Sequence, residues 1–407
     1  MDWGKEAERR LNEIATCSAP GPGVTRFPFT PEHAAALDVI RGWMTQAGLY
    51  CHMDAAATLI GRSASATGAP AVLIGSHQDS VREGGRYDGI MGVLIGCLAL
   101  EQLAAEGVQL PFPVEVLAFA DEEGVRFPTA LLGPRALTGQ LDPDALEMMD
   151  ADGVSLRAAL AQFGGDPDAL GQMRRPRDSV QAYLEIHIEQ GPVLQRDNVP
   201  CGIVTGICGI ERNSITFSGE TGHAGTVPMQ GRRDALVAAA DFIARVHDTA
   251  AGRDGLRATV GTLNLKPAVV NAIPREAELT LEIRALSDEE RAAFAAEAQV
   301  WGTEIAAARG TAFSMSRTYA QPAVPCAPAL MDTLEAGCRH SGIAAPRLPS
   351  GATHDASAMA ALCETAMLFV RCRDGISHRP EEFASAEDMA AAVQVTCEFL
   401  KGRAEAA

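Results

Sequence analysis

Residues 75–90 read "GSHQDSVREGGRYDGI" and follow the apolar run "PAVLI" at 70–74. A short apolar run that ends in turn residues predicts a buried strand. The loop after it holds one histidine, two aspartates and four glycines. Glycines allow sharp backbone turns, but a surface turn does not need an imidazole and carboxylates at fixed offsets. Two interpretations compete: a solvated polar turn, or the first half of a metal site.

Strand and helix patterns alternate around this stretch. Thr30 and Pro31 have the residue types of an N-cap and a first helical position, and apolar residues at helical spacing follow them. Strands separated by helices indicate an α/β domain with a mostly parallel central sheet. The expected segments are a helix that starts at 31 and closes at 48, a strand at 71–75, a helix at 89–105 and a strand at 113–120.

A further strand is expected at 181–189, "QAYLEIHIE", because apolar and polar residues alternate there. One face of this strand would carry apolar side chains and the other polar ones, so the pattern puts a histidine on a polar face. The apolar positions are Leu184, Ile186 and Ile188, and the polar positions are Glu185, His187 and Glu189.

The pattern changes between 205 and 320. This block reads as strand, helix, strands, helix and strand, and its second helix opens with Ser287 and Glu290 at capping-box spacing. From 321 the α/β pattern resumes. We therefore expect a discontinuous α/β domain made of 1–204 and 321–407, interrupted by a small α+β insert at 205–320. Two domains also suit a chain of 407 residues.

The composition argues against several classes of partner. The formal charge is −18, whereas a nucleic-acid binder needs clustered Lys and Arg against the phosphates. No apolar run reaches ~18 residues, so no membrane span is expected. The charged start "MDWGKEAERRLNEIA" does not fit a signal peptide, and a cytoplasmic protein is the default expectation. Ten scattered cysteines without a CxxC pair fit reduced thiols.

Six acidic or imidazole side chains stand within or just after strand candidates, where an open α/β sheet gathers ligand sites. Neutral imidazole and carboxylate bind zinc, manganese and related divalent ions, and a carboxylate can bridge two ions. Asp79 is placed to accept the other imidazole N–H of His77. The alternative stays open at each position, since a lone histidine at a strand end is more often a hydrogen-bonded core residue. The six candidates are His77, Asp88, Glu122, Glu123, His187 and His378.

Seven segments, in order, resemble the amidase/hydantoinase/carbamoylase branch of the M20 dinuclear metallopeptidase family. The resemblance implies a hydrolase of carbon–nitrogen bonds other than peptide bonds. Residues 1–204 and 321–407 would form its metal-binding catalytic domain, and 205–320 a lid and dimerisation domain. The segments are "GSHQDSVREGGRYDGIMGV", "FADEEGVRFPTALLGPRAL", "EIHIEQGPVL", "GETGHAGTVPM", "NAIPREAELTLEIRA", "SGATHDA" and "LFVRCRDGISHRPEEF".

The resemblance also implies two divalent ions, Mn²⁺ or Zn²⁺. Glu122 would be the general base, which takes a proton from the attacking water and delivers it to the leaving nitrogen. A histidine at position 187, within "HIEQGP", resembles the carbamoyl-type amidohydrolases, whereas peptidases of the family generally carry a carboxylate there. The implied ligands are His77 and His187 for one ion, Glu123 and His378 for the other, and Asp88 between them.

Substrate contacts are implied in the same way. In the family, a histidine like His223 reaches across a dimer to polarise the substrate carbonyl. Asn271 and Arg284 would bind the substrate carboxylate, and a guanidinium gives an acidic protein a local bidentate site for an anion. The other implied substrate residues are Gln190, which would hydrogen-bond the ureido group, and Thr353 and His354 on a loop expected to line the pocket.

The implied substrate is a small anionic ureido acid. The segment "MLFVRCRDGISH" resembles allantoate and ureidoglycolate enzymes most, so allantoate amidohydrolase is the first expectation. N-carbamoyl-L-amino acid hydrolase, ureidoglycolate amidohydrolase and β-ureidopropionase are the alternatives. Thr353 departs from the glycine that relatives usually carry, and its extra atoms can shift selectivity by ~1 to 3 kcal/mol. A non-catalytic metabolite-binding dimer is a remote alternative, because every implied ligand and the base are present.

Overall fold

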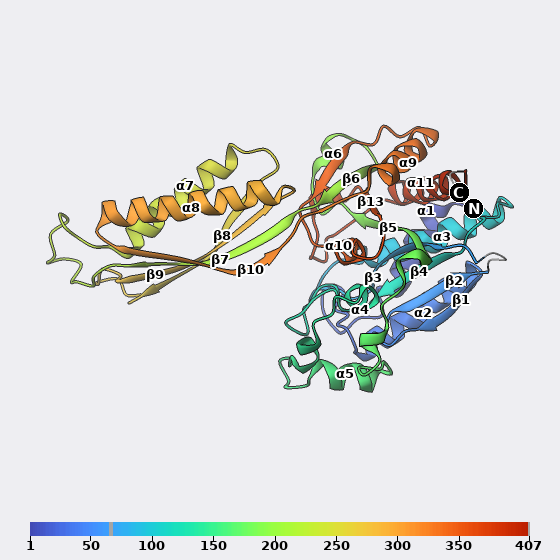
Figure 1. Cartoon of the computed structure of the whole chain (residues 1–407), viewed down its shortest axis with the longest axis horizontal. Helices are drawn as coiled ribbons and strands as arrows, with labels where there is room; N and C mark the ends of the chain where they lie inside the picture. Colours follow the sequence, from blue (N-terminus) through green and yellow to red (C-terminus); the bar gives the residue numbers. More distant parts are fainter. Residues whose placement is uncertain (65–67, 406–407) are drawn as a thin grey trace. The chain divides into compact units, whose positions relative to one another are not determined.

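The computed structural model describes residues 1–64 and 68–405. The chain forms two compact units (Figure 1), and each is built around a sheet. The larger unit consists of Met1–Thr205 and Cys326–Ala407, and the smaller unit is the intervening segment Gly206–Pro325. The insert expected from the sequence, 205–320, agrees with this segment to within a few residues at each end.

The nine-stranded sheet, most of which belongs to the larger unit, has the order β1-β2-β4-β3-β5-β13-β6-β11, and β12 pairs with β6. The central neighbours β4, β3, β5 and β13 are parallel, as expected for strands that alternate with helices. The fold class predicted from the sequence is confirmed. The bounds are β1 Leu49–Met53, β2 Leu59–Ser63, β3 Ala71–His77, β4 Val114–Phe119, β5 Val180–Ile188, β6 Cys201–Ile207, β11 Val324–Pro325, β12 Arg347–Ser350 and β13 Thr365–Val370.

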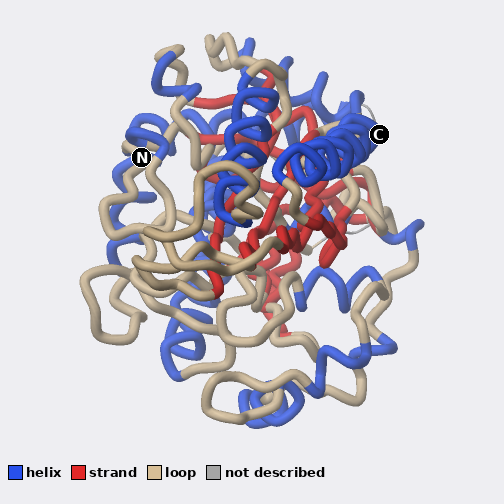
Figure 2. Tube along the Cα trace, turned by 90° about the vertical axis from the view of Figure 1, so that its left-hand side faces the viewer, coloured by secondary structure: helices blue, strands red, loops and turns tan. Residues whose placement is uncertain are grey.

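Helices of the larger unit pack against these strands, and Figure 2 distinguishes helices from strands by colour. The predicted start of α2 is confirmed, because Thr30 accepts a hydrogen bond from His33 N at 3.3 Å and Pro31 is the first helical residue. The bounds are α1 Trp3–Ile14, α2 Pro31–Gln46, α3 Ile90–Ala105, α4 Leu132–Thr138, α5 Leu156–Phe163, α6 Val193–Arg196, α9 Pro328–His340, α10 Asp355–Met359 and α11 Ala386–Glu405. Short 3-10 helices are η1 Pro143–Glu147, η2 Leu170–Gln172, η3 Arg177–Ser179 and η4 Arg373–Gly375.

The central strands are covered closely by these helices. Strands β3, β4 and β13 are buried along their whole length, as parallel strands usually are. Helix α3 packs on β3, β4 and β5, and a Cβ at Gly92 would lie 2.0 Å from the carbonyl oxygen of Ile186. The polar face predicted for residues 181–189 is therefore not a solvated face: Glu185 and His187 of β5 are buried as fully as their apolar neighbours.

The smaller unit is an antiparallel sheet with the order β10-β7-β9-β8, covered by two helices on one face (Figure 1). Phe217, Phe242 and Phe294 belong to the core between the sheet and the helices. The predicted cap of the second helix is present, because Ser287 Oγ accepts from Glu290 N at 3.1 Å. The bounds are β7 Gly209–Ser218, α7 Ala235–Ala251, β8 Arg257–Lys266, β9 Glu276–Ala285, α8 Asp288–Arg309 and β10 Ala312–Gln321.

The chain enters and leaves the smaller unit at adjacent points. β6 pairs antiparallel with β11, so that Ile207 lies opposite Val324 and Gly206 lies opposite Pro325. The insert therefore begins and ends on two hydrogen-bonded strands.

The helices and the cysteines can be compared with the expectations from composition. Within residues 1–64 and 68–405, no helix combines the length and the apolar character that crossing a bilayer would require. The ten cysteines are free thiols, and most of them are buried.

Phe217→Ala should lower the free energy of unfolding by about 3 to 5 kcal/mol, because it removes a fully buried ring that packs on Phe242 and Phe313. Chemical denaturation followed by circular dichroism measures the change. Val300→Ala, at an exposed position of α8, is the control and should have little effect. Equal losses in the two variants would contradict the packing described for this core.

Candidate metal centre

The parallel strands bring the predicted ligands to one edge of the sheet. Because β3, β4, β5 and β13 run in the same direction, their carboxyl ends meet at that edge. Each candidate lies at or just beyond such an end, apart from Asp88, which lies just before α3. His77 ends β3, Glu122 and Glu123 follow β4, His187 is next to the last residue of β5, and His378 follows β13 and η4.

Asp88 is the centre of the cluster. Its Oδ1 lies 3.0 Å from His187 Nε2 and 3.5 Å from His77 Nε2. Its Oδ2 lies 3.4 Å from His378 Nε2. One carboxylate oxygen thus faces two histidines and the other faces a third, which is the arrangement expected of a carboxylate that bridges two positions.

The two glutamates complete the cluster. Glu123 Oε1 lies 3.7 Å from His378 Nε2, and Glu122 Oε2 lies 3.9 Å from His77 Nε2. Candidate ligand atoms in each of three sets lie within 4.8 Å of one another. The sets are His77, Asp88 and His187; Asp88, Glu123 and His378; and His77, Glu122 and Glu123.

The histidine tautomers show that this donor set fits a cation. His77 Nδ1 lies 3.0 Å from the carbonyl oxygen of Asp79, and His187 Nδ1 lies 2.9 Å from that of Ile188. A carbonyl oxygen only accepts, so each Nδ1 carries a hydrogen, and in its neutral form each ring would present a lone pair at Nε2. These lone pairs would point at the carboxylate of Asp88, which only accepts when it is ionised. A divalent cation between such groups would satisfy both sides.

Asp79 makes a different contact from the one expected. The hydrogen bond from His77 goes to its backbone carbonyl, and its carboxylate Oδ1 lies 3.9 Å from the ring nitrogen. The carboxylate instead accepts from the backbone N–H groups of Glu122 and Glu123, each at 3.2 Å. Asp79 therefore orients the loop that carries both glutamates as well as the ring of His77.

Burial and like charge shift the pKa values of the acidic groups. The pKa of Glu122 lies well above its ordinary value, chiefly because of burial, with His77 opposing the shift and Glu123 adding to it. Burial and then Asp88 raise the pKa of Glu123 to about 7. A hydrogen bond to Asp88 raises the pKa of His378 to about 9. Such shifts are typical of clustered functional groups.

Backbone conformation at the cluster explains one glycine of the opening motif. Gly89 has φ 68°, and a Cβ there would lie 2.4 Å from the ring of His77. Two other positions, Gln190 with φ 55° and His378 with φ 58°, hold a left-handed conformation without being glycine. Strain of this kind is often retained where it aims a functional side chain.

Two of the three substrate residues predicted in the larger unit, Gln190 and His354, contact residues of the cluster. Gln190 Nε2 donates to Asp88 Oδ2 at 2.9 Å. The buried ring of His354 packs edge-on against His187, with 4.5 Å between centroids, and its Nε2 lies 2.7 Å from Ser350 Oγ. Thr353 is partly buried in the loop between β12 and α10.

The other predicted substrate residues belong to the smaller unit. His223 forms an isolated β-bridge with Ala272, and the carbonyl of Asn271 accepts from Ala224 N at 3.0 Å, so the two predicted residues lie on paired segments. Arg284 lies on β9 and donates to Glu282 at 2.8 Å. Their contribution to a substrate site stays a prediction.

The sequence analysis gave no role at the centre to three polar residues that lie there. Ser377 Oγ donates to Asp88 Oδ2 at 2.7 Å. Glu382 accepts from the backbone N–H of Asp88 at 3.0 Å. Glu185 accepts from Ser76 Oγ at 3.0 Å and from Ala356 N at 2.8 Å, which joins the residues beside His77 and His354. The alternating pattern of β5 marked Glu185 as polar, but no pattern separates Glu382 from its acidic neighbour.

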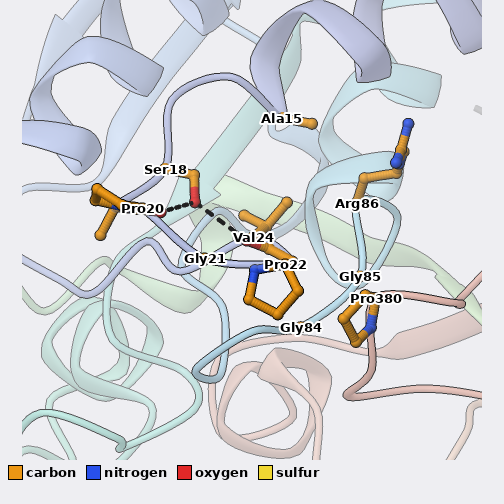
Figure 3. A pocket seen from close by; sticks show the side chains of 12 residues that line it. Ala15, Ser18, Pro20, Gly21, Pro22, Val24, Gly84, Gly85, Arg86 and Pro380 are labelled. Atoms are coloured by element: carbon orange, nitrogen blue, oxygen red, sulfur yellow. Dashed lines mark hydrogen bonds between the residues drawn. The ribbon is translucent and has the colours of Figure 1, made fainter.

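A cavity of about 260 Å³ lies next to the loops of Asp88 and His378 (Figure 3). Its walls are residues 18–24, Gly84–Arg86 and Pro380, together with Ala15. It is lined mainly by backbone, glycine and proline, and none of the predicted ligands or substrate residues is among its lining residues. The cavity therefore borders the centre without being part of it.

Comparisons with known proteins agree with this geometry. The family model for peptidase family M20/M25/M40 matches residues 48–402. The chain belongs to this family. It is 40% identical to an N-carbamoyl-L-amino acid amidohydrolase of Geobacillus stearothermophilus, over 97% of each chain. It is 36% identical to an allantoate deiminase of Arabidopsis thaliana, over 98% of this chain and 82% of that protein.

A solved structure of the same branch has the same fold. An amidase of the hydantoinase/carbamoylase family from Burkholderia multivorans superposes with a TM-score of 0.92 and 32% identity, over 98% of each chain. The M20 chain described here is therefore a hydrolase, and its family and its clustered histidines and carboxylates together indicate a divalent-metal enzyme.

Removal of divalent ions should lower the thermal stability of this M20 enzyme, because binding stabilises the folded state by about 2.7 kcal/mol per site when the free ion is at 100 times Kd. Differential scanning fluorimetry with a chelator, followed by addition of Mn²⁺ or Zn²⁺, measures the effect. In Asp88→Asn the melting temperature should respond much less to the ions. An equal response in Asp88→Asn and in the parent protein would contradict the assignment of Asp88.

Proposed function

We propose that this M20 enzyme hydrolyses the ureido C–N bond of a small N-carbamoyl carboxylate. The observation that supports this most is His187, whose Nε2 lies 3.0 Å from Asp88. Peptidases of the family generally carry a carboxylate at this position, whereas carbamoyl-type amidohydrolases carry a histidine within a segment like "HIEQGP". The relatives named N-carbamoyl-L-amino acid amidohydrolase and allantoate deiminase support the same reaction.

The proposal assigns the clustered side chains to two ions, Mn²⁺ or Zn²⁺, with the ligand set expected from the sequence. Divalent ions, when bound, lower the pKa of water and polarise a carbonyl oxygen. Asp88 would lie between the two positions, because its oxygens face different histidines. His77 and His187 would hold one ion, and Glu123 and His378 the other.

Glu122 is the proposed proton carrier. Its carboxylate is buried beside His77, and burial holds its pKa well above the ordinary value. A buried carboxylate whose pKa is raised can take a proton from the attacking water and give it to the leaving nitrogen. In this assignment Glu122 binds no ion, whereas Glu123 is a ligand of one.

The proposed substrate contacts are those expected from the sequence. Gln190 would hydrogen-bond the ureido group, and Thr353 and His354 would line the pocket. The smaller unit would contribute Arg284 and Asn271 to the substrate carboxylate. His223 would polarise the carbonyl from a second copy of the chain in a homodimer formed through the smaller units, and we expect the enzyme to act in the cytoplasm.

Allantoate is the substrate that we propose first, because the segment "MLFVRCRDGISH" resembles allantoate and ureidoglycolate enzymes. The identity of 40% to an N-carbamoyl-L-amino acid amidohydrolase favours N-carbamoyl-L-amino acids as the second candidate. Ammonia release from allantoate, ureidoglycolate, N-carbamoyl-β-alanine and several N-carbamoyl-L-amino acids would distinguish these. A protein that turned over none of them with Mn²⁺ or Zn²⁺ present would contradict the proposed reaction.

Glu122→Gln should lower kcat by about 10² to 10⁴-fold on the best substrate of that panel, because the amide cannot carry the proton. Ion binding should persist, since Glu122 is not a proposed ligand. Glu83→Gln, at an exposed position of the 75–90 loop, is the matched control and should keep full turnover. Full turnover by Glu122→Gln would show that another group moves the proton.

Thr353→Gly should change the ratio of kcat/KM for allantoate to kcat/KM for N-carbamoyl-L-amino acids by about 10-fold or more, because a methyl and a hydroxyl group leave the expected pocket wall. Steady-state kinetics on both substrates measure the ratio. Ser357→Gly, a partly buried position in α10, is the control. An unchanged ratio in Thr353→Gly would remove this residue from the substrate pocket.

A further inference from the structure

Glu382 is buried in the loop after β13, with 3% of its surface exposed. Its Oε1 accepts from the backbone N–H groups of Tyr87 and Asp88, at 2.9 and 3.0 Å. A carboxylate that accepts two backbone N–H groups fixes the segment that donates them. Here that segment carries the residue at the centre of the ligand cluster.

The second oxygen of Glu382 connects to the same centre through a hydroxyl. Ser377 Oγ lies 3.2 Å from Glu382 Oε2 and 2.7 Å from Asp88 Oδ2. The hydroxyl hydrogen lies between two carboxylates, and the shorter distance favours donation to Asp88. Asp88 is therefore held at its backbone by Glu382 and at its side chain by Ser377.

The close approach of Glu382 explains why residue 85 is a glycine, which the contacts within the metal cluster do not explain. A Cβ at Gly85 would lie 2.1 Å from Oε1 of Glu382 and 2.4 Å from its Cβ. No side chain fits between the two segments at that distance, so the second glycine of "EGGRYDG" allows the contact. Figure 3 shows Gly84, Gly85 and Pro380, which lie near this contact in the sequence and line the same cavity.

Glu382 also ties together two ligand-bearing loops. His378 stands on the same loop as Glu382, just after Ser377, and its Nε2 lies 3.4 Å from Asp88 Oδ2. The 78–89 loop and the 371–385 segment are far apart in sequence and meet through these contacts. We propose that Glu382 is a positioning residue that sets Asp88 and His378 at the separation which ion binding requires. The inference rests on the proposed metal-dependent function.

The first test compares two neighbouring acidic residues. Glu381 is exposed and pairs with Arg379 at 3.4 Å, so Glu381→Ala is the matched control for Glu382→Ala. The dissociation constant for Mn²⁺ or Zn²⁺ is measured by competition with a chromophoric chelator after the protein has been stripped of ions. We expect Glu382→Ala to bind the ions about 10- to 100-fold more weakly and Glu381→Ala to bind them as the parent does. Equal affinities in all three proteins would overturn the proposal.

Two conservative variants separate positioning from folding. In Glu382→Gln the amide oxygen can still accept from Tyr87 N and Asp88 N, so ion affinity should be restored. In Glu382→Asp the shorter side chain cannot reach both donors, so affinity should fall. Melting of the stripped proteins shows whether each variant folds, and this pair keeps the test valid if Glu382→Ala does not. A Gln variant as weak as the Asp variant, or an Asp variant as tight as the parent, would overturn the proposal.

The measurements of ion affinity and of turnover test the role of Glu382 and the proposed substrate class separately. A parent protein that binds the ions and shows the expected order of variants, yet releases no ammonia from any ureido acid, would disprove the proposed substrate class and leave the role of Glu382 standing. A parent protein that binds neither Mn²⁺ nor Zn²⁺ would disprove both.

Discussion

The structure depends on one constraint: several imidazole and carboxylate groups that could bind a cation converge around the buried Asp88. The Nε2 atoms of His77 and His187 face the same carboxylate oxygen, while the buried Glu122 and the partly buried Glu123 lie nearby. Removing such charges from water costs several kcal/mol per ion unless a partner compensates. A divalent cation is the partner whose charge and ligand preferences match the set. The arrangement around the cluster can be understood as the means of holding these groups in place.

Packing and hydrogen bonds to the surrounding backbone hold the clustered histidines and carboxylates in place. Parallel strands fix where each loop starts, and α3 packs against β5 at the distance that Gly92 allows. Asp79 binds two backbone N–H groups of the 121–124 turn. Glu382 does the same for the 87–88 segment. Two acidic residues outside the proposed ligand set thus orient the loops that carry it, which agrees with the general role of outer partners in metal sites.

Sequence patterns predicted the fold class, the starts of α2 and α8 and the residues that meet at the centre. These follow from local rules, such as the Thr30 cap and the buried run of β3, or from the types of residue at strand ends. The sequence analysis was less successful where a contact depends on tertiary structure. The alternation in β5 predicted a polar face, and it gave no sign that Glu185 and His187 are buried, because that depends on the elements that cover the face. Glu382 and Glu381 are indistinguishable in sequence, since only the approach of Gly85 separates their environments.

The pairing of β6 with β11 has a consequence for how this architecture can change. The points at which the chain enters and leaves the smaller unit, Gly206 and Pro325, are neighbours across a ladder of two strands. A segment inserted between adjacent strands can be lengthened, exchanged or lost without rerouting the rest of the polypeptide, because a short hairpin would close the same gap. Evolution could therefore remodel the insert as a module while the edge of the nine-stranded sheet that carries the histidines and carboxylates stayed unchanged.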